Sequence, residues 1–220
     1  MPTKKNFSVR NILLATDGSE FSSGAEREAI KLATLTDASL YVISVAQVNE
    51  VLMGVAPEVT ETIETRASEA LKRVKERAEK EGIKVESLFH EGEEPYRFIV
   101  EEAEKRSADV IVMGRRGLRG LKKMMMGSVT ALVIGHSPVP VFVVPRAGRL
   151  TFKRLLICTD GSEFSEKAKD YALGIAKRFS SKLVAISVAT TEEELEEAER
   201  NVQKIKEEAE KEGLKVETVA

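Results

Sequence analysis

Glycine and serine residues between positions 114 and 128 form the part of the sequence best suited to ligand binding. The stretch reads GRRGLRGLKKMMMGS. It follows an apolar, β-branched run that ends at Met113, and it precedes a second apolar run that begins at Val129. Such a loop joins the end of a buried strand to the start of a helix, where backbone N–H groups lack internal partners and the helix dipole is positive. The expected chemistry is anion binding, with phosphate as the typical ligand.

The glycines and the serine of this loop have predicted roles. Because Gly114, Gly117 and Gly127 carry no Cβ atom, we expect the backbone to approach phosphate oxygens closely and to adopt positive φ angles. The Ser128 hydroxyl is expected to cap the helix and to donate a hydrogen bond to a phosphate. The alternative for the glycines is a flexible loop that needs them only for turning.

Cations and methionines fill the space between the glycines. They are Arg115, Arg116, Arg119, Lys122, Lys123, Met124, Met125 and Met126. The positive charges are expected to attract phosphate groups, and the alternative is a set of solvated side chains with no ligand contact. For the methionines we expect irregular packing, with coverage of the site or of a partner as the alternative.

Apolar runs that alternate with amphipathic segments position this loop. We expect strands at 11–16, 39–45, 84–90, 109–113 and 139–144, a long helix at about 58–80, and a short helix from 128 that ends near Gly135. Strands that read as near-continuous apolar runs are typical of a parallel sheet that is covered on both faces. The sequence therefore predicts an α/β fold with a doubly wound, five-stranded sheet.

The chain then repeats itself. The hexapeptide TDGSEF occurs at 16–21 and again at 159–164, and EGLKVE at 212–217 echoes EGIKVE at 81–86. This tandem duplication predicts a complete domain over 1–147 and a partial second copy, strand-helix-strand-helix-strand, over 148–220. The second copy stops inside its third strand. A fragment of a longer tandem protein is favoured over a natural half-domain, and either one leaves an edge of the first strand unpaired.

The spacing of the loop (Gly, two residues, Gly, nine residues, Gly-Ser) resembles the ATP-binding signature of the universal stress protein family. The resemblance implies a Rossmann-like sheet with strand order 3-2-1-4-5 and a ligand crevice between the first and fourth strands. It also implies ATP or AMP as the ligand, with Mg²⁺ as an optional companion. The implied function is a nucleotide-responsive regulatory module in stress response.

The same resemblance implies a role for individual residues. Asp17 is implied to accept hydrogen bonds from the ribose or to help hold a metal, and an Asx-turn is the alternative. Backbone groups of Val45 and Met113 are implied to border adenine, and plain core packing is the alternative. The other implied site residues are Ala15 and Thr16 on the floor, Gly114 by the ribose, Gly117, Gly127, Ser128 and Val129 near the phosphates, and Arg115 beside them.

Composition excludes several classes of protein. The chain has 34 basic and 36 acidic residues, and this balance predicts neither a nucleic-acid partner nor a membrane surface as target. We expect no membrane span, because no apolar run approaches the required length of about 18 residues. Cys158 is the single cysteine and lies in an apolar strand, where we expect it to act as a small hydrophobe. Without a disulfide framework or a recognisable signal peptide, the cytoplasm is the expected location.

No catalytic constellation is recognisable in the sequence. The P-loop pattern G-x-x-x-x-G-K-[ST] and the pattern G-x-G-x-x-G are both absent. His90 and His136 have no neighbouring cysteine or second histidine that would make a metal site, so we predict neither catalytic residues nor metal ligands of that kind. Binding is therefore favoured over turnover. The alternatives are a slow ATPase or phosphotransferase and a nucleotide-free protein that dimerises and interacts with partners.

The segment Val139–Val144 is an apolar edge strand with flanking prolines, and the family resemblance implies that it pairs between domains or subunits. Because the second copy has no equivalent, we predict a homodimer through this strand. Charged residues in place of Val141 and Val143 are expected to give monomers in light scattering. An unchanged mass would contradict this prediction.

Overall fold

The computed structural model describes residues 7–49, 54, 56–117 and 126–220. It divides into two compact units, a first unit of residues 8–149 and a second unit of residues 150–220 together with the first seven residues. The division differs from the predicted break after residue 147, and Phe7 explains part of the difference. Its ring centroid lies 6.3 Å from that of Phe179, and its backbone nitrogen lies 3.0 Å from the position that a Cβ atom on Gly174 would take.

A five-stranded parallel sheet forms the centre of the first unit, and its strand order is β3-β2-β1-β4-β5. The α/β fold class and the strand order 3-2-1-4-5 are therefore confirmed. The strands are β1 (Asn11–Ala15), β2 (Ser39–Ala46), β3 (Val85–Glu91), β4 (Val110–Gly114) and β5 (Val141–Val144). Because the order reverses between β1 and β4, the chain leaves these neighbouring strands toward opposite faces and a crevice forms between them.

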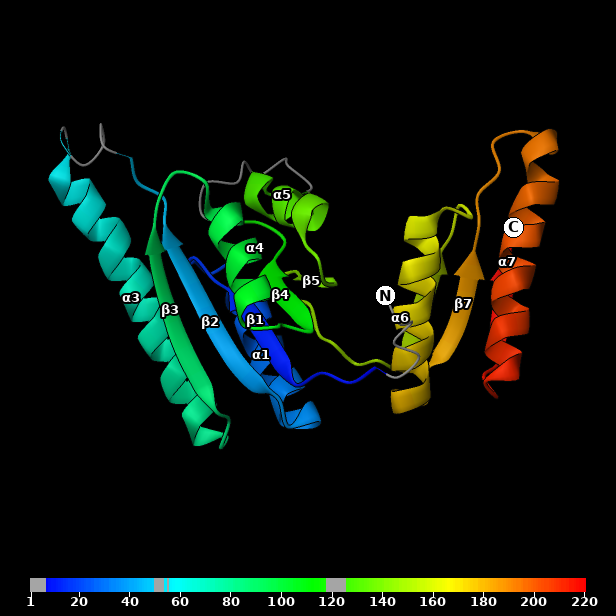
Figure 1. Cartoon of the computed structure of the whole chain (residues 1–220), viewed down its shortest axis with the longest axis horizontal. Coiled ribbons are helices and arrows are strands. Elements are labelled where there is room, and N and C mark those ends of the chain that lie inside the picture. The colour runs from blue at the N-terminus through cyan, green and yellow to red at the C-terminus, as the bar shows by residue number, and fades with distance from the viewer. Residues whose placement is uncertain (1–6, 50–53, 55, 118–125) are drawn as a thin grey trace. The chain divides into compact units, whose positions relative to one another are not determined.

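Helices cover both faces of this sheet (Figure 1). They are α1 (Ser23–Thr36), α3 (Pro57–Lys80), α4 (Pro95–Lys105) and α5 (Ser128–His136). Right-handed crossovers place α1 and α3 on one face and α4 and α5 on the other, because the strand order runs in opposite directions for the two pairs. Consecutive residues Ile12, Leu13 and Leu14 of β1 are all fully buried, as a doubly covered strand requires. None of the described helices has the length and apolar character needed to cross a membrane.

The strands differ from their predicted bounds by one or two residues, and the start of β5 and the end of α5 have a local explanation. Strand β5 begins at Val141 and not at Val139, because the Val139 N–H donates to Ser137 Oγ in a turn (3.2 Å) and does not join the sheet. Helix α5 continues through Gly135 to His136. The His136 ring nitrogen Nδ1 lies 2.8 Å from the Leu132 carbonyl oxygen, so the imidazole binds a carbonyl of the last turn.

The second unit contains a three-stranded parallel sheet of order β6-β7-β8. Its elements are β6 (Arg154–Cys158), α6 (Glu163–Phe179), β7 (Lys182–Ile186), α7 (Glu192–Lys211) and β8 (Val216–Val219). The core of this unit is formed by Ile157, Leu173, Ala176, Leu183, Ala185, Val202, Ile205 and Ala209. These residues come from α6, α7 and the sheet, so the helices bury one face of β6 and β7.

Strand β6 also has exposed apolar side chains. Leu156 is 63% exposed, and Cys158 is exposed as well. The expectation that Cys158 acts as a small buried hydrophobe is therefore wrong. The prediction rested on the apolar run around Cys158, whereas α6 and α7 bury Ile157, which points to the other face of the strand.

Gly24 in α1 is a position where a methyl group is expected to destabilise the fold. A Cβ atom there would lie 2.3 Å from the Pro145 carbonyl oxygen. Helix propensity alone favours alanine over glycine by about 1 kcal/mol. Overlap with a backbone carbonyl opposes this gain and costs on the order of 1–3 kcal/mol. We expect Gly24→Ala to lower the free energy of unfolding in chemical denaturation.

Gly135→Ala is the matched control, because no described atom lies within 4 Å of the position of its Cβ. This change is expected to raise the free energy of unfolding by up to about 1 kcal/mol. Stabilisation of similar size by both substitutions would show that Gly24 does not contact the backbone after β5.

Candidate functional site

A cavity of about 260 Å³ lies at the carboxyl ends of β1, β2 and β4 in the first unit. Its position is the crevice expected where the strand order reverses. It is lined by Ala15, Thr16, Asp17, Ser22, Ile43, Ser44, Val45, Gln47, Ile63, Arg66, Ala67, Pro95, Ile99, Met113, Gly114, Arg116, Gly117, Gly127, Ser128, Val129 and Thr130. The structure thus brings together the predicted residues of the Asp17 loop, the end of β2 and the glycine loop. Their roles toward a ligand stay predictions.

Arg115 is the predicted site residue that does not line the cavity. Its side chain is exposed, whereas the neighbouring Arg116 lines the cavity and its guanidinium carbon lies 5.6 Å from the centroid of the Phe21 ring. Alternation of side chains along the extended chain after β4 separates the two arginines. The other predicted members of this cluster, Arg119, Lys122, Lys123, Met124 and Met125, lie outside the described residues, and Met126 is exposed.

The Asp17 carboxylate has one oxygen in a local turn and one beside the glycine loop. Oδ1 accepts hydrogen bonds from the Ser19 N–H at 3.1 Å and from the Ser19 hydroxyl at 2.7 Å. This is the Asx-turn that the sequence analysis names as an alternative. Oδ2 lies 2.6 Å from the position that a Cβ atom on Gly117 would take. Oδ1 therefore has a structural role in the turn, while Oδ2 lies at the wall of the cavity beside Gly117.

The glycines of the loop permit close packing, and the expected positive φ angles are wrong. The described glycines with positive φ are Gly18, Gly82, Gly161 and Gly213. A Cβ atom on Gly114 would lie 3.1 Å from the Phe21 carbonyl oxygen, and one on Gly127 would lie 3.3 Å from Arg116 Cα. Glycine is needed here because other parts of the first unit come too close for a side chain, and not because the backbone is left-handed.

The start of α5 differs from the expected serine cap. Gly127 is the N-cap with an extended backbone, and no side-chain cap is present there. Its N–H donates to the Arg115 carbonyl oxygen at 2.9 Å, so this amide is used inside the loop. Because Ser128 is the first helical residue, its exposed hydroxyl cannot serve as the N-cap. The N–H groups of Ser128, Val129 and Thr130 have no backbone acceptor in the described part of the chain, as expected for a first helical turn.

Val45 and Met113 both line the cavity and also belong to the core. Met113 is 5% exposed and packs in the hydrophobic cluster between the sheet and the helices α4 and α5, and the partly buried Val45 packs against that cluster. The core-packing alternative is therefore correct for their side chains. Backbone groups of both residues can line the cavity while their side chains pack in the core, because both residues lie at the carboxyl ends of parallel strands.

Several lining residues were not predicted from the sequence, and Ser44 is the most informative of them. It is 1% exposed, and its Oγ atom has no hydrogen-bond partner among the described residues. Arg66, Ile63 and Ala67 come from α3, on the side of the cavity next to Ser44. The signal available in the sequence was a hydroxyl inside the apolar run of β2, directly before Val45.

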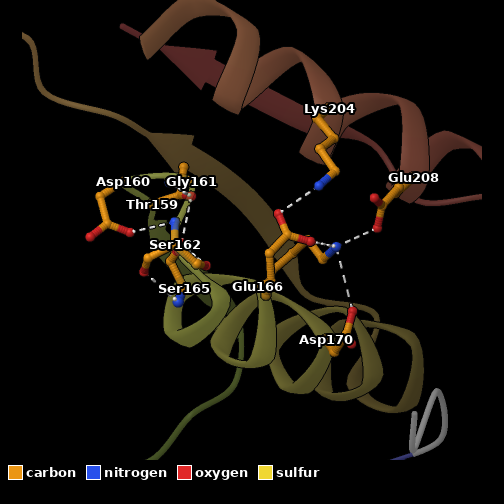
Figure 2. A network of polar contacts seen from close by, with 10 residues as sticks. Thr159, Asp160, Gly161, Ser162, Ser165, Glu166, Asp170, Lys204 and Glu208 are labelled. Atoms are coloured by element: carbon orange, nitrogen blue, oxygen red, sulfur yellow. Dashed lines mark hydrogen bonds and ion pairs between the residues drawn. The ribbon is translucent and has the colours of Figure 1, made fainter. Parts of the chain in front are cut away.

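The second unit repeats the aspartate loop. Asp160 Oδ1 accepts a hydrogen bond from the Ser162 N–H at 3.0 Å, as Asp17 does from Ser19 (Figure 2). Hydrogen bonds from the side chain and backbone of Ser162, and from Ser165, lower the pKa of Asp160 to about 2. Gly161 has a φ of 77°, and Asn201 of α7 lies close to it.

Comparison with known proteins identifies relatives of both copies. The model of the universal stress protein family matches residues 8–145 and 151–220. A universal stress protein of Methanocaldococcus jannaschii is 39% identical over 142 residues, which cover 62% of this chain and 82% of the relative. A universal stress protein of Bacillus subtilis is 32% identical over 144 residues, covering 60% of this chain and 97% of the relative. The crystal structure of a universal stress protein from Archaeoglobus fulgidus matches with a TM-score of 0.73 at 25% identity, covering 96% of this chain and 78% of that one.

Titration of Asp160 tests the geometry of the repeated loop. Its depressed pKa means that the carboxylate contributes stability above the unfolded value, and that this contribution is lost as the pH falls through about 2. We expect carbon-detected NMR to give an apparent pKa of about 2 for this carboxyl. Ser162→Ala is expected to raise it toward the ordinary aspartate value, because a hydrogen bond to the charged form is lost. A wild-type pKa in the ordinary range would show that the serines do not bind this carboxylate.

Proposed function

Since the chain belongs to the universal stress protein family, we propose that its first unit binds an adenine nucleotide, ATP or AMP, and acts as a nucleotide-responsive regulatory module. The observation that carries the proposal is the lining of the cavity. Asp17, the glycines Gly114, Gly117 and Gly127, and the first turn of α5 all line it. A carboxylate suits ribose hydroxyls, and a helix N-terminus suits phosphates.

The phosphate end of the site has enough donors without a P-loop lysine. The amides of Ser128, Val129 and Thr130 and the Ser128 hydroxyl remain after Gly127 has donated to Arg115. Hydrogen bonds to a charged group contribute roughly 1.5–3 kcal/mol each, and a helix N-terminus adds about 0.3–1 kcal/mol. Four donors thus reach the roughly −8 kcal/mol of micromolar affinity after ordering costs.

The other end of the cavity fits a purine base. Ile43, Ile63 and Ile99 provide apolar surface, and the ends of β2 and β4 provide backbone groups. The Ser44 hydroxyl is buried there without a partner among the described residues, which costs roughly 1–3 kcal/mol until a ligand or a water binds it. An apolar pocket with a few convergent polar groups is the usual form of a small-molecule site.

A magnesium ion fits this arrangement as a companion of ATP. Mg²⁺ is commonly held by one or two carboxylates together with the phosphates of the substrate. Asp17 supplies one carboxylate, with Oδ2 directed to Gly117 of the phosphate-binding loop. When bound, the ion would neutralise phosphate charge, and Asp17 would fix its position.

Strand β5 supports a second proposal, that two chains pair as a homodimer. It is the edge strand of the sheet of the first unit, and Val141, Phe142 and Val143 are each only partly buried. An apolar edge strand presents unpaired backbone groups that a second copy can bind. The substitutions at Val141 and Val143 described above test this proposal separately from nucleotide binding.

Gly117→Ala tests the nucleotide proposal with a small change. The new methyl group would overlap Asp17 Oδ2 and displace the carboxylate, while the flexible side chain limits the effect on folding. We expect isothermal titration with ATP and Mg²⁺ to show micromolar binding to the wild type and at least tenfold weaker binding to the variant. Gly135→Ala, outside the cavity, is the control and is expected to bind like the wild type. Absence of binding to the wild type would reject the proposal, and equal affinity of Gly117→Ala would reject this geometry.

A further inference from the structure

A buried carboxylate lies behind the Asp17 loop and contacts residues on three elements. Glu26 of α1 is 2% exposed. Its Oε1 accepts a hydrogen bond from the Thr16 hydroxyl at 2.7 Å and another from Arg73 of α3 at 3.0 Å. Its Oε2 lies 4.0 Å from Arg77, one turn further along the same helix. The glutamate therefore joins the end of β1 to α3.

Thr16 connects Glu26 to the Asp17 loop through a hydrogen bond. Its Oγ1 accepts a hydrogen bond from the Gly18 N–H at 3.2 Å, so the residues on both sides of Asp17 are held by one hydroxyl. Gly18 itself packs against α3, since a Cβ atom there would lie 3.0 Å from Ala70 Cβ. The hydroxyl has one proton and two acceptors within reach, the Glu26 carboxylate and Ser22 Oγ at 2.9 Å. Donation to the charged carboxylate and donation to the serine direct the lone pairs of Thr16 differently toward the loop.

The second copy provides an internal comparison, because the same positions carry opposite charges. Alignment of the two TDGSEF motifs puts Lys169 at the position of Glu26, and alignment of EGIKVE with EGLKVE puts Glu208 at that of Arg77. Lys169 is 3% exposed, and its ammonium group binds Glu208 and also Glu166, the latter at 2.7 Å (Figure 2). Both copies thus have a buried ion pair between the first helix and the long helix.

The two copies differ in what the ion pair contacts. An ammonium group has no lone pair and cannot accept a hydrogen bond from a threonine hydroxyl. Thr159, the counterpart of Thr16, keeps only the serine contact, with its Oγ1 3.1 Å from Ser165 Oγ, where Thr16 has Ser22 Oγ at 2.9 Å in addition to the glutamate. Thr159 still accepts a hydrogen bond from the Gly161 N–H at 3.1 Å. The ion pair therefore holds the helices together in both copies, but it contacts the threonine of the aspartate loop only in the first.

We propose that Glu26 is a positioning residue of the nucleotide site, which holds the Asp17 loop in its binding geometry through the Thr16 hydroxyl. The inference rests on the nucleotide function proposed above. It assigns two separable tasks to one carboxylate: docking of α3 through the arginines, and orientation of the loop through Thr16. The second copy retains the first task with reversed charges, and there Ser165 alone is the partner of the threonine hydroxyl.

Two substitutions at Glu26 separate these tasks. Glu26→Gln and Glu26→Met both remove the negative charge and therefore the ion pairs with Arg73 and Arg77, but only glutamine keeps an acceptor at position 26, whereas methionine leaves Thr16 with Ser22 Oγ alone. We expect similar losses of stability for the two variants. We expect Glu26→Met to bind ATP about tenfold more weakly than Glu26→Gln in isothermal titration, because a misplaced Asp17 loses a hydrogen bond that it otherwise makes.

A third variant reproduces the ion pairs of the second copy. The triple substitution Ser23→Glu, Glu26→Lys and Arg77→Glu reproduces the charges of Glu166, Lys169 and Glu208, and Arg73 then has the role of Lys204, which lies 3.1 Å from Glu166. This variant is expected to unfold close to the wild-type midpoint and yet to bind ATP at least tenfold more weakly. Should it fail to fold, the comparison of glutamine with methionine still decides the question.

The amide resonance of Gly18 gives a readout that needs no nucleotide. In the unliganded protein we expect it to stay near the wild-type position in Glu26→Gln and to shift in Glu26→Met, because the Thr16 hydroxyl then donates to Ser22 alone and its lone pairs turn. Equal ATP affinity and equal Gly18 shifts for glutamine and methionine would overturn the inference. If the wild type binds no ATP but the Gly18 shifts differ as expected, the proposed function fails while the orientation of the loop by Glu26 stands.

Discussion

The close contact between the Asp17 loop and the glycine loop is the constraint on which the site depends. The two loops leave neighbouring parallel strands at the point where the strand order reverses, and they meet with almost no space between them. A single Cβ atom on Gly117 would lie 2.6 Å from the Asp17 carboxylate. A carboxylate and the amides of a helix N-terminus thus line one crevice, an arrangement that suits a ligand with both hydroxyl groups and phosphates.

The duplicated half of the chain shows what this contact adds. Both copies fold the TDGSEF motif into the same aspartate turn, so the turn itself forms with either a glutamate or a lysine at the position of Glu26. In the first copy the turn is also connected to α3 through Glu26, and a glycine loop faces it. In the second copy a lysine replaces that glutamate, and its ion pairs bind helix to helix without reaching the turn. Comparison of the copies therefore separates the interactions that both copies share from those found only beside the cavity of the first unit.

The fold and ten of the 21 lining residues could be predicted, because buried parallel strands form continuous apolar runs and their carboxyl ends meet at one edge. Other features depend on contacts between distant segments. Gly117 lacks a side chain because Asp17 lies against it, and no local pattern distinguishes this from a need for positive φ. In the sequence, Ser44 is one polar residue in an apolar strand, and its burial becomes evident only when α3 packs on β2. Cys158 reads as a core residue, since its exposure is decided by the helices packed on β6 and not by the sequence of that strand.

The most direct measurement of the central claim is a titration of the isotope-labelled chain with ATP and Mg²⁺, followed by amide NMR. If backbone groups of the glycine loop and of the first turn of α5 bind the phosphates, the amides of Gly117, Ser128 and Val129 will show the largest shifts and will saturate together. Gly161, in the repeated turn of the second copy, will stay at its initial position. Saturating shifts that leave the amides of Gly117, Ser128 and Val129 unchanged would contradict the account.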